Sequence, residues 1–391
     1  MKSNTIKHID FFSGPGGICT GFQAAGIDTL LAVEKVKSCV ETYSRNHPNV
    51  KVLNKDIRNV SKDDIKDYIG KVDVITSGMP CETFSTAGSS SRSFYDHRQQ
   101  LYYETIRLAD ILKPHLILFE NVPGILSKKT IKNGSRFVVD DIFDDLSAIG
   151  YKYYIQTTLY ASDFGVPQNR QRFFIIATSD KDLKLKVPIA KHNGKVTVND
   201  AFFDLPKIEA NQTKEPKVYL KKECEYTNLM RDEYFWKKEN KATDVLTYHV
   251  APKHRKGTLE RFKLIEQGEN LKDIFDKLSE QEIKKLQEQK VLPKKWFIQR
   301  NMRLKPNEPS KTVTSHCLDE LIHPVIDRSL TVREVARLQS FPDYYDFIGG
   351  PFICPHLYET QDKYEQIGDA VPPLLAYHWG LVIKEILETK V

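Results

Sequence analysis

The chain has 391 residues, of which 40% are hydrophobic and 28% are charged, and its formal net charge is +6. This length fits one large domain or two unequal domains, and the composition is that of an ordinary globular protein. No run of eighteen apolar residues is present, and the first twelve residues lack the apolar core and cleavage site of a signal peptide. We therefore expect a cytoplasmic protein without a membrane partner.

The cysteines give no sign of a shared structural role. There are six of them, and no two form a CxxC pair. This scatter argues against a disulfide framework and against a thiol-rich zinc site, so no metal is expected and each cysteine has to be judged alone.

The first half of the chain alternates between strand-like and helix-like segments. Short β-branched runs predict strands at 7–12, 28–34, 71–78, 115–122 and 172–179. Amphipathic or capped segments predict helices at 17–26, 37–47, 99–113 and 138–150. This alternation predicts an α/β fold with a Rossmann-like, doubly wound and mainly parallel sheet, whose ligand lies beyond the carboxyl ends of the strands.

The alternation is lost between about residues 183 and 309, a stretch rich in lysine, glutamate and asparagine. We interpret it as a second, smaller domain or a large insertion with one helix at 271–290. Beyond it, 329–342 predicts a helix capped by Ser329 or Thr331, and 372–390 predicts a closing amphipathic helix.

Three features near the first strands suggest a nucleotide. The turn "DFFSGPGG" allows close backbone approach and exposes the amides that open the next helix, although it is not a GxGxxG motif. Glu34 ends the second strand, where an acid can bind ribose hydroxyls. Asp56, in "NKDIRNV" after a further strand between 34 and 71, could accept from an adenine amino group. Together they predict a cofactor that contains adenosine.

Further reactive groups follow later strands. Cys81 comes directly after "GMP", Glu120 ends the next apolar run, and Arg170 and Arg172 precede the last predicted strand. Singly, each has an ordinary explanation: a buried thiol, a strand terminus, or surface cations. A cysteine hydrolase lacks a visible catalytic histidine arrangement, and a nicotinamide dehydrogenase leaves the arginines unexplained.

These residues lie in motifs that resemble those of the cytosine-5 DNA methyltransferases, especially the compact bacterial modification enzymes. The matching segments are "DFFSGPGG", "GMPCETFS", "ENVPG", "VPQNRQRFFIIA", "HPVIDRSLTVREVARLQSFPDYY" and "YEQIGDAVPPLLA". All six occur in the family's order over nearly the whole chain, which makes a chance resemblance negligible.

The resemblance implies S-adenosyl-L-methionine as cofactor and cytosine in double-stranded DNA as substrate. Cys81 would add to carbon 6 of the base, Glu120 would hydrogen-bond ring nitrogen 3, and Arg172, beside Arg170, would hold the base carbonyl. The base would have to leave the helical stack. The implied cofactor-binding positions are Phe12, Ser13, Gly14, Gly16, Gly17, Glu34, Lys35, Asp56, Ile57, Gly78, Pro80, Leu101, Asp369 and Ala370.

The resemblance also implies a domain plan: a catalytic domain at 1–182, a target-recognition domain at 183–357, and a C-terminal segment at 358–391 that returns to the catalytic domain. Within the plan, Lys253, His254, Arg255 and Arg300 are candidate DNA contacts. The helix residues Arg333, Glu334 and Arg337 resemble an internal polar network, the alternative being an exposed helix face. Ser85, Arg92 and Arg98 are candidate contacts in the loop after Cys81.

Two positions depart from the family pattern. Glu82 stands where glutamine is common, and Asp369 stands where asparagine is usual. An ionised aspartate cannot donate a hydrogen bond, which puts one cofactor or backbone contact in question.

Three functions remain open at this point. The first is a monomeric bacterial modification enzyme, associated with the nucleoid and paired with a cognate restriction endonuclease. The second is a transfer-RNA cytosine-5 methyltransferase, against which the insertion of more than a hundred residues counts. The third is a non-catalytic DNA-binding relative, which the complete set of Cys81, Glu120 and Arg172 opposes.

Overall fold

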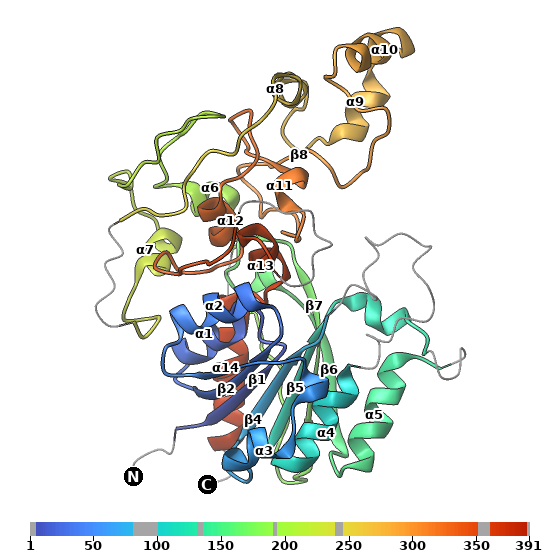
Figure 1. The fold of residues 1–391 in the computed structure, drawn as a ribbon, viewed down its shortest axis with the longest axis vertical. Coiled ribbons are helices and arrows are strands. Elements are labelled where there is room, and N and C mark those ends of the chain that lie inside the picture. Colours follow the sequence, from blue (N-terminus) through green and yellow to red (C-terminus); the bar gives the residue numbers. More distant parts are fainter. Residues whose placement is uncertain are drawn as a thin grey trace.

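The computed structural model describes residues 5–80, 101–130, 136–190, 194–238, 245–350 and 360–388. Within these residues, seven strands form one sheet in the order β3-β2-β1-β4-β5-β7-β6 (Figure 1). The strands are β1 (Lys7–Phe11), β2 (Asp28–Glu34), β3 (Lys51–Asn54), β4 (Val74–Gly78), β5 (Leu116–Asn121), β6 (Tyr153–Tyr160) and β7 (Gln171–Thr178).

The sheet confirms the predicted α/β fold class. Strands β1 to β5 run parallel, and β7 runs antiparallel to both β5 and β6. The strand order reverses between β1 and β4, so a crevice is expected beyond the carboxyl ends of these two strands. The sequence analysis missed β6. This edge strand carries polar residues and exposed tyrosines, which do not make the apolar run by which the other strands were predicted.

Helices cover both faces of the sheet (Figure 1). Alternate residues of each strand face opposite sides, so that Leu116 and Leu118 of β5 join one core cluster while Ile117 and Phe119 join the other. The first face carries α1 (Gly17–Ala24), α2 (Lys37–Asn46) and α14 (Pro373–Glu388), and the second carries α3 (Lys62–Ile65), α4 (Tyr102–Leu112) and α5 (Val138–Ala148).

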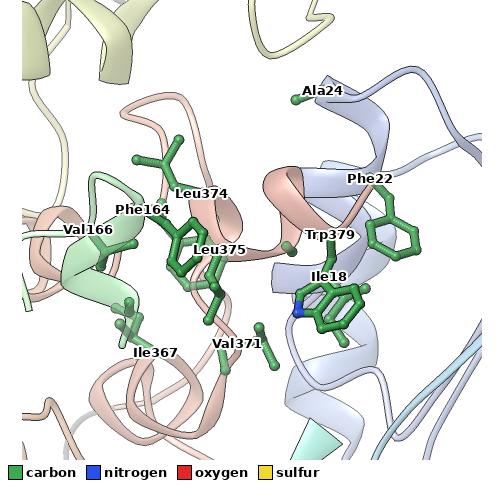
Figure 2. Packing of buried hydrophobic residues seen from close by; sticks show 14 of the residues in the cluster. Ile18, Phe22, Ala24, Phe164, Val166, Ile367, Val371, Leu374, Leu375 and Trp379 are labelled. Atoms are coloured by element: carbon green, nitrogen blue, oxygen red, sulfur yellow. The ribbon is translucent and has the colours of Figure 1, made fainter. Parts of the chain in front are cut away.

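The C-terminal helix α14 packs directly against α1. Figure 2 shows Trp379 of α14 beside Ile18 and Phe22 of α1, and Leu375 of α14 beside Phe164 from the short turn after β6. The approach is close enough to require glycine, because a Cβ on Gly17 would lie 2.2 Å from the carbonyl oxygen of Val371. The end of the chain is therefore built into the sheet domain.

The middle of the chain divides into two parts. Residues of α6 (Val198–Phe202), α7 (Glu225–Arg231) and α12 (Val332–Leu338) share the large core cluster with α1 and α14. A smaller cluster holds together a lobe that contains α8 (Lys256–Lys263), α9 (Leu271–Lys277), α10 (Glu280–Glu288), β8 (Met302–Arg303) and β9 (Leu321–Ile322). The second part thus has a hydrophobic core that is separate from the large core cluster.

The prediction of a single helix at 271–290 is wrong, because the structure has the two helices α9 and α10 in this range. Ser279 interrupts the pattern: its hydroxyl accepts from the amide of Glu282, whose carboxylate in turn accepts from the amide of Ser279. This capping box starts a new helix within the apolar periodicity.

Helix α12 confirms the predicted cap and polar network. Thr331 caps it in a capping box with Glu334. The Arg328 guanidinium holds both carboxylate oxygens of Glu334 at 2.7 Å, and Arg337 binds Asp204 and Asp343 at 2.6 Å each. These groups are buried, so the network ties α12 to the segment after α6 and is not an exposed helix face.

The helix α13 (Lys363–Asp369) and the short helix α11 (Cys317–Glu320) complete the fold. Within the described residues, no helix is long and apolar enough to cross a membrane.

Candidate active site

The turn after β1 has an unusual backbone. Phe12 has φ of 54°, Gly14 of 53° and Gly16 of 99°, so the chain passes through the left-handed region three times in five residues. Glycine adopts this conformation readily, whereas a phenylalanine there is strained. Such strain is retained where the surrounding structure requires it, which is common at ligand sites.

Glu34 fastens this turn to the end of β2. Its Oε2 accepts from the amide of Gly14 at 2.9 Å, and its Oε1 accepts from the amide of Val36 at 2.8 Å. Burial raises the pKa of the Glu34 carboxyl, while these two amides act in the opposite direction. Each oxygen keeps a second acceptor site for a ligand hydroxyl.

Asp56 caps the turn after β3 and pairs with Arg58. The Arg58 guanidinium donates to both carboxylate oxygens, at 2.9 and 2.6 Å, and this ion pair lowers the pKa of Asp56. The predicted acceptor for an adenine amine is thus already held as an ionised, oriented carboxylate. The pairing of residues 56 and 58 was missed because it depends on the tight turn between them.

A cavity of about 260 Å³ lies at the carboxyl ends of β1, β2, β4 and β5. It joins most of the predicted site residues. Those that line it are Phe12, Ser13, Gly14, Gly17, Glu34, Lys35, Asp56, Ile57, Gly78, Pro80, Leu101, Glu120, Arg172, Asp369 and Ala370.

Among the described residues, two that were predicted for the site, Gly16 and Arg170, do not line this cavity. Gly16 instead faces the side chain of Tyr345, whose hydroxyl oxygen would lie 2.8 Å from an added Cβ. Arg170 is buried and donates to the carbonyls of Val313 and Gly368 at 2.5 and 2.7 Å. These contacts tie the segment before α11 to the last turn of α13, and the catalytic role of Arg170 stays a prediction.

Glu120 and Arg172 form the opposite end of the same cavity. Arg172 Nε lies 2.8 Å from Glu120 Oε1, and both side chains are about nine-tenths buried. Burial raises the pKa of the Glu120 carboxyl, and the guanidinium of Arg172 opposes this rise. A raised pKa favours the protonated carboxyl, which is the form that can donate a proton to a bound ligand.

The segment Gly78–Pro80 is held beside Glu120. Gly78 pairs with Glu120 across β4 and β5, and Asn121 donates from Nδ2 to the carbonyl of Met79 at 3.3 Å. Pro80 lines the cavity, and Cys81 is the next residue. Cys81 itself lies outside the described residues, as do Glu82, Ser85, Arg92 and Arg98.

The structure also shows how Asp369 is accommodated. Gln361 donates from Nε2 to Asp369 Oδ2 at 3.0 Å, and its Oε1 accepts from the Cys39 thiol, also at 3.0 Å. All three residues line the cavity. Sequence reasoning missed Cys39 and Gln361, because nothing in their spacing links α2 to the residues before α13.

The groups that line the cavity suit an organic ligand. Within the described residues, no three histidine, cysteine or acidic side chains lie close enough together to hold a metal ion. An aromatic ring, two oriented carboxylates and backbone amides at one end match the polar edges of an adenosine, as expected at such a switch point.

Comparison with known proteins agrees with this geometry. The model of the C-5 cytosine-specific DNA methylase family matches residues 6–385. The Type II methyltransferase M.DdeI of Desulfomicrobium norvegicum is 37% identical over 94% of this chain and 86% of its own length. The Type II methyltransferase M1.HphI of Haemophilus parahaemolyticus is 30% identical over 95% of this chain and 85% of its own length.

Solved structures agree as well. One is the crystal structure of a prophage-encoded E. coli protein described as a DNA modification methyltransferase. The match covers 98% of this chain and 100% of the E. coli chain, with a TM-score of 0.73 and 26% identity. The S. pombe Dnmt2 methyltransferase, with a TM-score of 0.54 and 17% identity over 98% of this chain and 99% of its own, shares the fold alone. The chain therefore belongs to the family of C-5 cytosine-specific DNA methylases and is a DNA (cytosine-5)-methyltransferase.

Proposed function

We propose that this enzyme transfers the methyl group of S-adenosyl-L-methionine to carbon 5 of a cytosine within a short, specific sequence of duplex DNA. The single observation that supports this most is the shared cavity. Its one end has the groups suited to an adenosine, Phe12, Glu34 and Asp56, and its other end has the buried pair Glu120 and Arg172.

The residues present fit the methyl donor. Glu34 would accept from the ribose hydroxyls, Asp56 from the adenine amine, and Phe12 would pack on the adenine ring. A Cβ on Gly14 would meet no atom within 4 Å, so the space beside this turn is not filled by protein. When bound, the donor supplies an electrophilic methyl group; activation of the base depends on the chain's own side chains.

Cys81 would supply the nucleophile. Its thiolate adds to carbon 6 of the cytosine, which makes carbon 5 electron-rich enough to be methylated. Loss of the carbon-5 proton then restores the ring double bond and expels Cys81. Because an ordinary thiol is only a few per cent ionised at neutral pH, Cys81 requires positive charge nearby. Arg172 is a cation of the same cavity.

Glu120 and Arg172 would hold the base. A protonated Glu120 donates to ring nitrogen 3 as negative charge develops there, and Arg172 both orients this carboxyl and binds the base carbonyl. The base has to leave the stack to reach them, since the cavity is walled by the strand ends.

We further propose that residues 183–357 recognise the target sequence and that residues 358–391 complete the catalytic domain. The similarity to Type II methyltransferases supports a role in protecting bacterial DNA from a cognate restriction endonuclease. The enzyme would act in the cytoplasm at the nucleoid, as a monomer, because one base needs only one site.

Transfer of radiolabelled methyl from S-adenosylmethionine separates this proposal from its alternatives. Unmethylated duplex DNA and transfer RNA serve as competing substrates, with Cys81→Ala as the control. We expect 5-methylcytosine in DNA and none with the variant. Label in transfer RNA alone would favour the RNA enzyme, and DNA binding without any label would favour the non-catalytic relative.

A further inference from the structure

The positive charge of the chain is concentrated in one lobe. Residues 253–305 contain 15 lysines and arginines and 8 aspartates and glutamates, a net charge of +7, whereas the whole chain carries +6. The remaining 338 residues together are thus slightly negative. A polyanionic partner is attracted to the part of the surface where charge of the opposite sign gathers.

The same lobe has a stretch of seven consecutive exposed residues, "KKWFIQR", at 294–300. We call it the basic–aromatic segment. In Figure 1 it belongs to the orange chain between α10 and β8. Its apolar residues are unusually open to solvent: Trp296 is 39% exposed, Phe297 55% and Ile298 50%. Exposed apolar side chains gathered in this way mark interaction surfaces.

Positively charged side chains lie over two of these rings. The ammonium of Lys272 lies 5.9 Å from the centre of the Trp296 ring, and the guanidinium of Arg300 lies 5.5 Å from that of Phe297. Among the described residues, no carboxylate pairs with Lys294, Lys295 or Arg300, whereas Lys272 and Lys277 have acidic partners. The segment therefore offers positive charge that the protein does not neutralise itself.

The segment is fixed at both ends. Leu292 is buried in the small core of the lobe, and the Asn301 side chain donates to the carbonyl of Asp319 at 2.8 Å. Between these points, the amide of Arg300 donates to the carbonyl of Phe297 at 3.0 Å, which closes a turn. A surface held in this way can bind without first being ordered.

We propose that the basic–aromatic segment is a DNA-reading surface of this enzyme. Lys294, Lys295 and Arg300 contact phosphates, and Phe297 and its apolar neighbours contact base edges in the groove. This inference rests on the proposed function, and it names the residues that recognise the target. His254 is not part of this surface, because its ring packs against Phe262 and accepts from the amide of Ser329.

The test measures equilibrium binding to two duplexes, one with the methylated site, mapped by bisulfite sequencing, and one with that site scrambled. The variants are Lys294→Ala with Lys295→Ala, and Phe297→Ala. The matched control is Lys284→Ala with Lys285→Ala, two exposed lysines of α10 in the same lobe. Binding of S-adenosylhomocysteine, measured by calorimetry, reports whether each variant is folded.

Loss of Lys294 and Lys295 should weaken binding to both duplexes and reduce the slope of log affinity against log salt by about 2. Phe297→Ala should lower the preference for the correct duplex about tenfold or more. The inference is overturned if the lysine variant loses no more affinity than the control, or if Phe297→Ala keeps the full preference. A change in oligomeric mass with unchanged DNA affinity would mean that the surface binds a second copy. A wild-type enzyme that does not methylate DNA would overturn the proposed function as well.

Discussion

Arg172 Nε lies 2.8 Å from Glu120 Oε1, although the two residues come from strands that run in opposite directions. This pair decides the chemistry of the cavity. Burial favours the protonated form of the Glu120 carboxyl, and the guanidinium of Arg172 both orients this carboxyl and counters the rise of its pKa. In the proposed mechanism, this carboxyl donates a proton to the base that enters the cavity.

Glu120→Gln should reduce kcat by about 10²- to 10⁴-fold, because an amide keeps the shape of the carboxyl but cannot transfer its proton. Single-turnover methylation of a duplex with the target site measures this step. Binding of S-adenosylhomocysteine should stay within a few-fold of wild type. A variant with nearly full kcat would contradict the role of Glu120.

The two arginines near β7 should behave differently. Arg170→Met removes a buried donor to the carbonyls of Val313 and Gly368, so it should cost about 2–4 kcal/mol in unfolding free energy. Arg172→Met should instead lower kcat strongly and reduce the free energy of unfolding less than Arg170→Met does. Urea denaturation and single-turnover rates measured on both variants check this contrast. Equal loss of stability with full activity in both would contradict it.

Asp369→Asn should shift ligand preference without breaking the site. An asparagine oxygen can still accept from Gln361 Nε2, while the negative charge that Asp369 adds to the cavity is removed. The preference for the cationic S-adenosylmethionine over the neutral S-adenosylhomocysteine should fall about three- to tenfold. Calorimetric titration with each ligand measures it, and an equal change for both would refute the charge argument.

Asp10 belongs to a chain of buried polar groups below the site. Thr76 donates to Asp10 Oδ1 at 2.7 Å, and the ring of His8 lies 2.7 Å from the same hydroxyl. Burial raises the pKa of Asp10 to about 7 and lowers that of His8 to about 3. Both groups are thus neutral at mildly acid pH, and Asp10 ionises near neutrality.

This raised pKa should make stability depend on pH. Between about pH 4 and pH 7 the folded Asp10 holds a proton that the unfolded chain releases, so stability falls as the pH rises through this window. Asp10→Asn keeps an acceptor for Thr76 and should be more stable than wild type at pH 8 by roughly 2–4 kcal/mol, with little difference at pH 4. Denaturation at the two pH values tests this, and a constant difference would count against it.

Much of the site could be predicted because its residues follow the strands directly. Glu34 ends β2 and Glu120 is the second-last residue of β5, and parallel strands bring such ends to one edge. The contacts that the sequence did not predict join residues that are far apart in the chain. Arg170 reaches carbonyls of residues more than a hundred positions away, and Gln361 joins Cys39 to Asp369. No local pattern encodes these contacts.

Two errors in secondary structure have local causes. Strand β6 alternates exposed and half-buried residues at the sheet edge, so it lacks the apolar run of a buried strand. The break between α9 and α10 is caused by the capping box of Ser279, which a continuous apolar periodicity obscures.

The proposed mechanism requires the thiolate of Cys81 to add to carbon 6 of the target cytosine. The most direct measurement uses a duplex with 5-fluorocytosine at the target position. A base can remove a proton from carbon 5 but cannot remove fluorine in its place, so Cys81 is not expelled and the adduct persists. With S-adenosylmethionine present, denaturing electrophoresis and mass spectrometry should show one covalent complex, with the bond at Cys81, and none for Cys81→Ala. A wild-type enzyme that methylates ordinary cytosine but never forms this complex, or a complex attached at another residue, would contradict the account.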